Sequence, residues 1–196
     1  TSELGTQQWV DRSLGAQLGG IPGQAMIVLG MVTGIMAVGR YFAGPLIHAL
    51  NPLGVLLLSA VLTTLGLFLM SSASGAMVYV SAIVFAVGVC YFWPTMIGVT
   101  AQYVPRSGAL GMSLVGAAGM FALTSWNPTI GGWIDRARAA AEAEGLTGNA
   151  VEVAAGQGAL SQLVYFPVAL IVVFAALFMA RNWINATAGD DVSSAN

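Results

Sequence analysis

The chain has 196 residues, of which 57% are hydrophobic and only 7% are charged, with six Lys and Arg against eight Asp and Glu. An ordinary soluble domain carries about 25% charged residues, so the composition excludes a water-soluble globule, and its ample apolar surface excludes a disordered chain. A net charge of −2 without any Lys argues against nucleic-acid binding, and one Cys and one His leave no Cys/His metal cluster. The composition therefore predicts a protein that lies in the lipid bilayer.

The first segment, residues 1–10, is interpreted as the end of a helix, and we expect an N-terminal portion to be missing before it. Glu3 and Gln7 are four residues apart and share one face of such a helix, with Gln8 and Trp9 beside them. A carboxylate inside the bilayer is expensive and usually functional. The alternative is a loop, in which Glu3 is simply solvated.

Five apolar stretches follow, at residues 24–50, 52–71, 76–104, 108–134 and 160–183. Each is long enough to cross a bilayer core of about 30 Å, which needs roughly 20 helical residues. None alternates apolar and polar residues as barrel strands do, and backbone groups in lipid must be paired within the chain. We therefore predict an all-α membrane protein, a helical bundle of five full transmembrane helices plus the end of a sixth. Residues 135–158 are predicted to form an extracytoplasmic loop that begins with a short interfacial helix.

Glycines and prolines interrupt these spans. Gly30 and Gly34 form a GxxxG pair, which is typical of closely packed membrane helices. Pro94, deep in the third span, removes a backbone hydrogen bond and predicts a kink. Tyr91 and Trp93 beside it either fill the bundle or form the wall of a polar cavity next to a hinge.

Two further polar positions stand out. Asn127 precedes Pro128 toward the end of the fourth span, beside Trp126, and repeats the combination of proline and aromatic residue. Arg40 marks the end of a helix in the first span, where its side chain either extends to water or binds the carbonyl end of a neighbouring helix.

Several segments, taken in order, resemble the major facilitator superfamily. MAVGRYFAGPLIHALNPLGVLLLSAVL is similar to the link between the second and third helices of a six-helix half, although the acidic residue and basic run of that loop are absent. GVCYFWPTMIG resembles the tenth helix of these transporters and NPTIGGWIDR the end of the eleventh. TSELGTQQWV resembles the outer end of the seventh helix in the sugar-permease-like members.

The resemblance implies that residues 1–196 are the C-terminal half of a transporter whose N-terminal half is missing. It implies a multi-pass protein of the cell membrane, such as the bacterial inner membrane, with Arg40 and Arg106 on the cytoplasmic side. Its partners would be the lipid bilayer, the missing half and a small solute, with no cofactor, metal or nucleic acid. The two halves would rock to open one central site alternately to each side.

Carried over to this sequence, the resemblance places a solute site on the residual seventh helix and the tenth helix. Amide and carboxylate groups beside aromatic rings suit a sugar-like solute, and Glu3 could couple transport to protons. The expected substrate-binding residues are Glu3, Gln7, Gln8, Trp9, Tyr91, Trp93 and Asn127. The expected gating and loop residues are Gly39, Arg40, Gly44, Pro45 and Pro94.

Two other functions are alternatives to transport. An intramembrane enzyme needs a nucleophile with a base, paired carboxylates or metal ligands, and no such motif is present, so we expect no enzyme. A non-transporting membrane subunit or receptor with the same fold is the alternative to a transporter.

Overall fold

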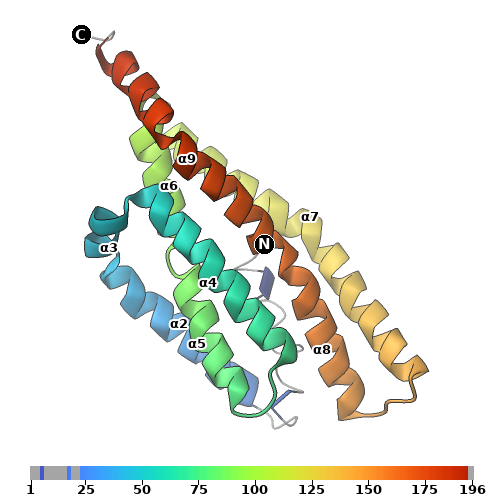
Figure 1. The fold of residues 1–196 in the computed structure, drawn as a ribbon. Helices are drawn as coiled ribbons and strands as arrows, with labels where there is room; N and C mark the ends of the chain where they lie inside the picture. The colour runs from blue at the N-terminus through green and yellow to red at the C-terminus, as the bar shows by residue number, and fades with distance from the viewer. Residues whose placement is uncertain (1–4, 7–16, 19–22, 194–196) are drawn as a thin grey trace.

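The computed structural model describes residues 5–6, 17–18 and 23–193, and these residues contain helices and turns but no β-strand (Figure 1). Five helical segments in this part of the chain are long and apolar enough to cross a membrane: Gln24–Tyr41, Pro52–Ser72, Met77–Ala101, Gly108–Ala143 and Asn149–Ala180. The prediction of an all-helical chain with five apolar spans is confirmed. The helices in chain order are α2 (Gln24–Tyr41), α3 (Ala43–Leu50), α4 (Pro52–Ser72), α5 (Met77–Val89), α6 (Phe92–Tyr103), α7 (Gly108–Ala143), α8 (Asn149–Leu163) and α9 (Tyr165–Ser193), with a short 3₁₀ turn at Pro105–Ser107.

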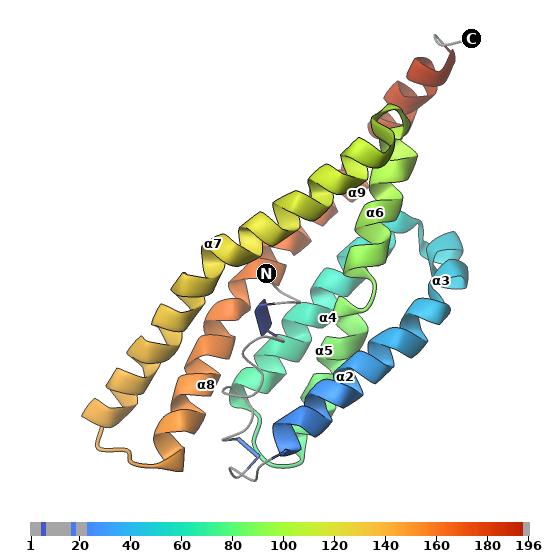
Figure 2. The ribbon, with the colours of Figure 1, turned by 180° about the vertical axis from the view of Figure 1, so that it is seen from behind.

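Helix α4 lies at the centre of the bundle and packs against α5, α6, α8 and α9 (Figures 1 and 2). Its contact with α5 is the most extensive in the molecule, because glycines let the two backbones approach. A Cβ atom at Gly66 would lie 2.5 Å from the Cα of Phe85, and one at Gly88 would lie 2.4 Å from the backbone nitrogen of Thr63. The predicted close packing at glycines therefore occurs here. It does not occur at Gly30 and Gly34, where an added Cβ would meet none of the described residues within 4 Å.

Three of the predicted spans are divided at a proline. The chain leaves its helix at Phe42, at Cys90–Tyr91 and at Val164, and the next helix then has a proline as its third residue: Pro45, Pro94 and Pro167. The first backbone N–H groups of a helix have no partner within it, so a proline costs little in the first turn. Just before Pro94 the helix is interrupted at Cys90–Tyr91, although both residues keep right-handed helical backbone angles, and residues 24–50 are divided at Phe42.

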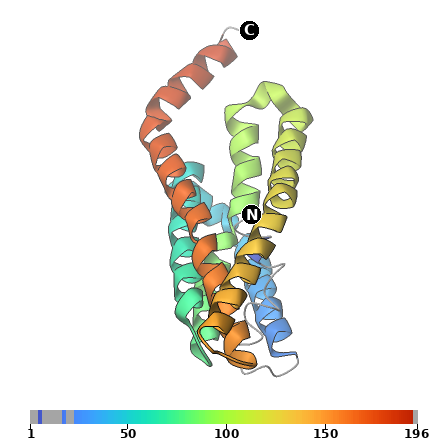
Figure 3. The same ribbon diagram turned by 90° about the vertical axis from the view of Figure 1, so that its right-hand side faces the viewer.

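Helix α7 differs, because it runs without interruption through Pro128 and continues to Ala143. The predicted loop at residues 135–158 is mostly helical, since α7 and α8 occupy most of it and only Glu144–Gly148 connects them; the short helix expected at its start is the end of α7. The Ala-rich stretch after Asp135 has high helix propensity, and Gly145 and Gly148 adopt positive φ angles that turn the chain. Figure 3 shows this α7–α8 hairpin at one end of the bundle and the α6–α7 turn at the other.

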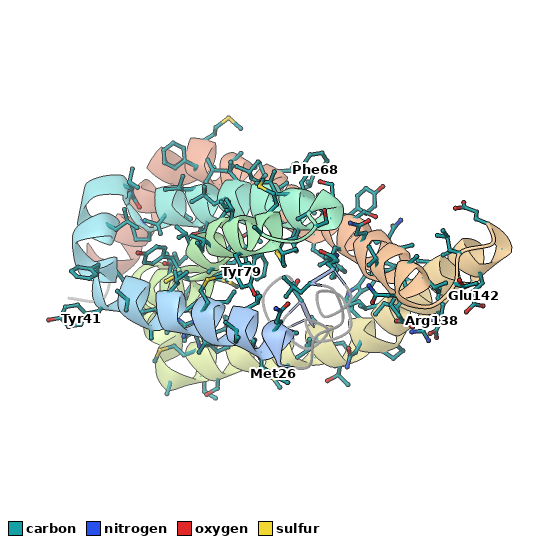
Figure 4. The ribbon with its side chains drawn as sticks, turned by 90° about the horizontal axis from the view of Figure 1, so that it is seen from below. Met26, Tyr41, Phe68, Tyr79, Arg138 and Glu142 are labelled. Atoms are coloured by element: carbon teal, nitrogen blue, oxygen red, sulfur yellow. The ribbon has the colours of Figure 1, made fainter. Side chains whose placement is uncertain are left out.

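Two side-chain contacts hold the α7–α8 hairpin in place. A nitrogen of the Arg138 guanidinium lies 2.6 Å from each carboxylate oxygen of Glu152 on α8. The side-chain amide of Gln157 donates a hydrogen bond of 3.2 Å to the backbone oxygen of Ala73, at the end of α4. Figure 4 shows Arg138 and Glu142 at the far end of this hairpin, away from α2. The hairpin therefore extends beyond the α4–α5 turn as helix.

Candidate functional site

The structure places the predicted site residues in three parts of the bundle. Tyr91, Trp93 and Pro94 lie at the start of α6, and Asn127 lies on α7. The gating residues lie at the end of α2 and the start of α3: Gly39, Arg40, Gly44 and Pro45. The four residues predicted on the first segment lie outside the described residues: Glu3, Gln7, Gln8 and Trp9.

The last turn of α2 packs directly on the break between α5 and α6. The Nε–H of Arg40 donates a hydrogen bond of 3.2 Å to the backbone oxygen of Cys90. The thiol of Cys90 in turn donates to the backbone oxygen of Met36, at 3.4 Å. An added Cβ at Gly39 would lie only 2.7 Å from the Cys90 sulfur, so a glycine is needed for this approach. We call this contact the α2–α5 junction, formed by Met36, Gly39, Arg40 and Cys90.

The chemistry of proline explains the position of Arg40. In a continuous helix the backbone oxygen of Cys90 would accept from the N–H of residue 94, and Pro94 has none. Arg40 supplies a donor from another helix. Of the two roles predicted for Arg40, the structure therefore shows the second, in which it binds the carbonyl end of a neighbouring helix.

The first turn of α6 connects α2 and α7 through two aromatic side chains. The Tyr91 hydroxyl lies 3.5 Å from the position of a Cβ at Gly39, so it reaches α2. The Trp93 ring lies 3.8 Å and 3.5 Å from Cβ positions at Gly116 and Gly119 of α7. Tyr91 and Trp93 thus contact different neighbouring helices. About 40% of Trp93 remains exposed.

The structure does not bring Asn127 next to Tyr91 and Trp93. It lies eight residues beyond Gly119 on α7, which is about 12 Å along the helix axis at 1.5 Å per residue. Its neighbours in the sequence belong to a cluster of three aromatic rings, in which Trp126 and Trp133 of α7 surround Phe166 of α9. The ring centroid of Phe166 is 5.0 Å from that of Trp126 and 6.2 Å from that of Trp133. The spacing of seven between the two tryptophans is the signal in the sequence that could have predicted this cluster.

Two buried hydroxyl groups were also missed by the sequence reasoning. Thr63 of α4 and Thr95 of α6 are almost completely buried, and their Oγ1 atoms have no hydrogen-bond partner among the described residues. Elsewhere in the bundle, threonine hydroxyls bond to the carbonyl four residues earlier, as Thr64 does to Ala60. Thr63 instead packs against Gly88. Threonine in an apolar run gives no sign of which of these two arrangements it adopts.

The predicted loop residues on α3, Gly44 and Pro45, give less support for a functional site. An added Cβ at Gly44 would meet nothing within 4 Å, so no close approach requires a glycine there. Pro45 is the third residue of α3, where it matches Pro94 in α6. No group of three or more His, Cys, Asp or Glu residues that could hold a metal ion occurs within the described part of the chain.

Comparison with known proteins gives no relative: no family model, curated protein or solved structure matches the chain. Over the residues it describes, the structure establishes a helical fold with five helices long and apolar enough to cross a membrane.

Proposed function

We propose that the chain is part of a secondary transporter that moves a small solute across a membrane by alternating access, as its resemblance to the major facilitator superfamily implies. The observation that supports this most is the break in the middle of the α5–α6 span, flanked by Tyr91 and Trp93. Transporters commonly form solute sites from discontinuous membrane helices near the bilayer midplane.

The surroundings of the break support a cavity on one side of it. Irregular backbone at membrane depth is tolerated where it is buried in protein or lines a water-filled cavity. Cys90 and Phe92 are buried, whereas Trp93, whose ring lies beside Gly116 and Gly119 of α7, remains about 40% exposed. No residue in the most apolar stretch of α7 is buried. A second helical unit that covers α7 would enclose the space beside Trp93, and we place the solute there.

The side chains available suggest the solute class. An indole ring stacks on the C–H face of a sugar, and a phenol hydroxyl can donate to or accept from its hydroxyl groups. Glu3, Gln7, Gln8 and Trp9 would add carboxylate, amide and aromatic groups from the first segment. We therefore propose a sugar-like solute, with Glu3 as the candidate proton carrier.

The test is uptake of radiolabelled sugars by the complete protein in proteoliposomes, with and without an imposed pH gradient. We expect Trp93→Ala to lower uptake at least tenfold. Phe68→Ala is the matched control, because Phe68 is an aromatic residue in the last turns of α4 that is 62% exposed. Glu3→Gln should abolish the response to the pH gradient.

Three results would contradict the proposal. Equal uptake by the Trp93→Ala and wild-type proteins would remove Trp93 from the solute site. Accumulation by Glu3→Gln that still follows the pH gradient would remove Glu3 from the coupling. Binding of a solute without any flux would favour a non-transporting receptor.

A further inference from the structure

We propose that Arg40 is the positioning residue of the α5–α6 break: its Nε–H replaces the backbone hydrogen bond that Pro94 removes, and α6 turns about Cys90–Tyr91 when this contact opens. Arg40 would thereby set the positions of Tyr91 and Trp93. The claim that this movement governs uptake depends on the proposed function. The claim that Arg40 holds the break is independent of it.

The argument begins with the backbone. The N–H of Thr95 bonds to the backbone oxygen of Tyr91 at 3.1 Å, whereas Pro94 has no N–H with which to form the corresponding bond to the oxygen of Cys90. A carbonyl left unpaired in an apolar environment is costly, so a donor from outside the helix is required. The Nε–H of Arg40, 3.2 Å from the oxygen, is that donor.

Charge adds to this bond. Arg40 is the basic residue in the last turn of α2, and the oxygen it contacts belongs to the end of α5. The carbonyl ends of helices carry partial negative charge, so a guanidinium beside the end of α5 is favourable. A hydrogen bond from an ionised donor is roughly twice as strong as one between neutral groups. Arginine and lysine are not equivalent here, since the Nε–H lies on a planar group with fixed direction.

A second contact holds the same place. The Cys90 thiol bonds to the backbone oxygen of Met36, and this is possible because Gly39 leaves room for the sulfur. An alanine at position 39 would push the thiol aside. Gly30 and Gly34 lie on the same helix and contact nothing that a Cβ would reach, so they provide matched controls. The α2–α5 junction is thus a specific contact rather than a general property of the glycines in α2.

Cys90 provides the readout, because it is the only cysteine in the chain and is 1% exposed. The experiment measures the rate at which N-ethylmaleimide modifies the peptide that contains Cys90, by mass spectrometry, in the complete protein reconstituted in lipid. We expect Arg40→Leu to raise this rate at least fivefold and Arg40→Lys to raise it less. Gly39→Ala should also raise it, whereas Gly30→Ala should leave it unchanged.

The decisive variant is Pro94→Ala, which restores the missing N–H to α6. In this background the oxygen of Cys90 has a partner within its own helix, so we expect Arg40→Leu to change the modification rate less than twofold. An equal acceleration in both backgrounds would overturn the proposal, because Arg40 would then act independently of the lost bond. No acceleration in either background would overturn it as well.

Uptake separates this proposal from the proposed function. We expect Arg40→Leu to raise the KM for uptake more than it lowers the maximal rate, and Pro94→Ala to restore the KM. A KM that Pro94→Ala does not restore would overturn the positioning role but leave transport standing. Absence of uptake by the wild-type protein would overturn the proposed function, while the modification rates would still decide the role of Arg40.

Discussion

The α4–α5 pair and helix α7 are both apolar enough to cross a membrane, yet they pack in opposite ways. In the most apolar stretch of α4 half of the residues are buried, whereas in the most apolar stretch of α7 no residue is buried. The difference lies in what the glycines face. Gly66 and Gly88 face the backbone of the neighbouring helix, whereas Gly116 and Gly119 face only the edge of the Trp93 ring.

This difference has a physical meaning in lipid. Apolar side chains gain little by leaving lipid for another helix, so close backbone approach and specific contacts decide which helices stay together. A backbone contact cannot adjust when a methyl group is added, whereas a ring edge can move. We therefore expect the α4–α5 pair to tolerate added volume less well than the contact between α6 and α7.

The largest effect is expected where the rigid pair is disturbed. Gly88→Ala would place a Cβ atom 2.4 Å from a backbone nitrogen of Thr63, so we expect it to destabilise the protein by about 2–3 kcal/mol, the upper range for overpacking. The measurement is unfolding in mixed micelles. Gly30→Ala adds the same methyl group in open space and should change the stability by less than about 1 kcal/mol. Equal effects of the two substitutions would remove the distinction between packed and open glycines.

A smaller effect is expected at the aromatic cluster that joins α7 to α9. Trp126 and Phe166 meet edge to face, with an interplanar angle of 83°. A double-mutant cycle with Trp126→Ala and Phe166→Ala should give a coupling energy of about 1 kcal/mol. Phe121→Ala is the control on the same helix, since Phe121 is 75% exposed, and it should show no coupling to Phe166. A coupling near zero for Trp126 would mean that the cluster does not hold α7.

The smallest effect is expected at the ion pair of the α7–α8 hairpin. Arg138 and Glu152 are 36% and 42% exposed, and such pairs contribute about 0–1 kcal/mol. Glu152→Gln should therefore cost less than about 1 kcal/mol at low salt, and salt should reduce the cost further. Unfolding at two sodium chloride concentrations tests this. A cost that stays the same at high salt would show that the pair is shielded from solvent.

Pro94 and Pro128 show how much of the fold can be predicted from the sequence. Both are prolines within long apolar stretches, and the sequence predicts a disturbance at each. The structure has an interrupted helix at the first and a continuous helix at the second. The break at Pro94 lies where α2 provides a donor from Arg40, fifty residues away in the sequence. A local rule for proline does not contain that information.

By itself, the sequence determined that the described part of the chain is helical, that it contains five apolar spans and that a turn at Asn51 precedes the second of them, because these features depend on local composition. The tertiary structure alone decided that α5 and α6 separate at Cys90, that Gly66 and Gly88 rather than Gly30 and Gly34 carry close contacts, and that Asn127 lies away from Trp93. The physical reason is that each of these features depends on residues distant in the sequence. They supply the donor for a carbonyl that lacks its helical N–H, the second backbone of a close contact, or the other residues of a shared site.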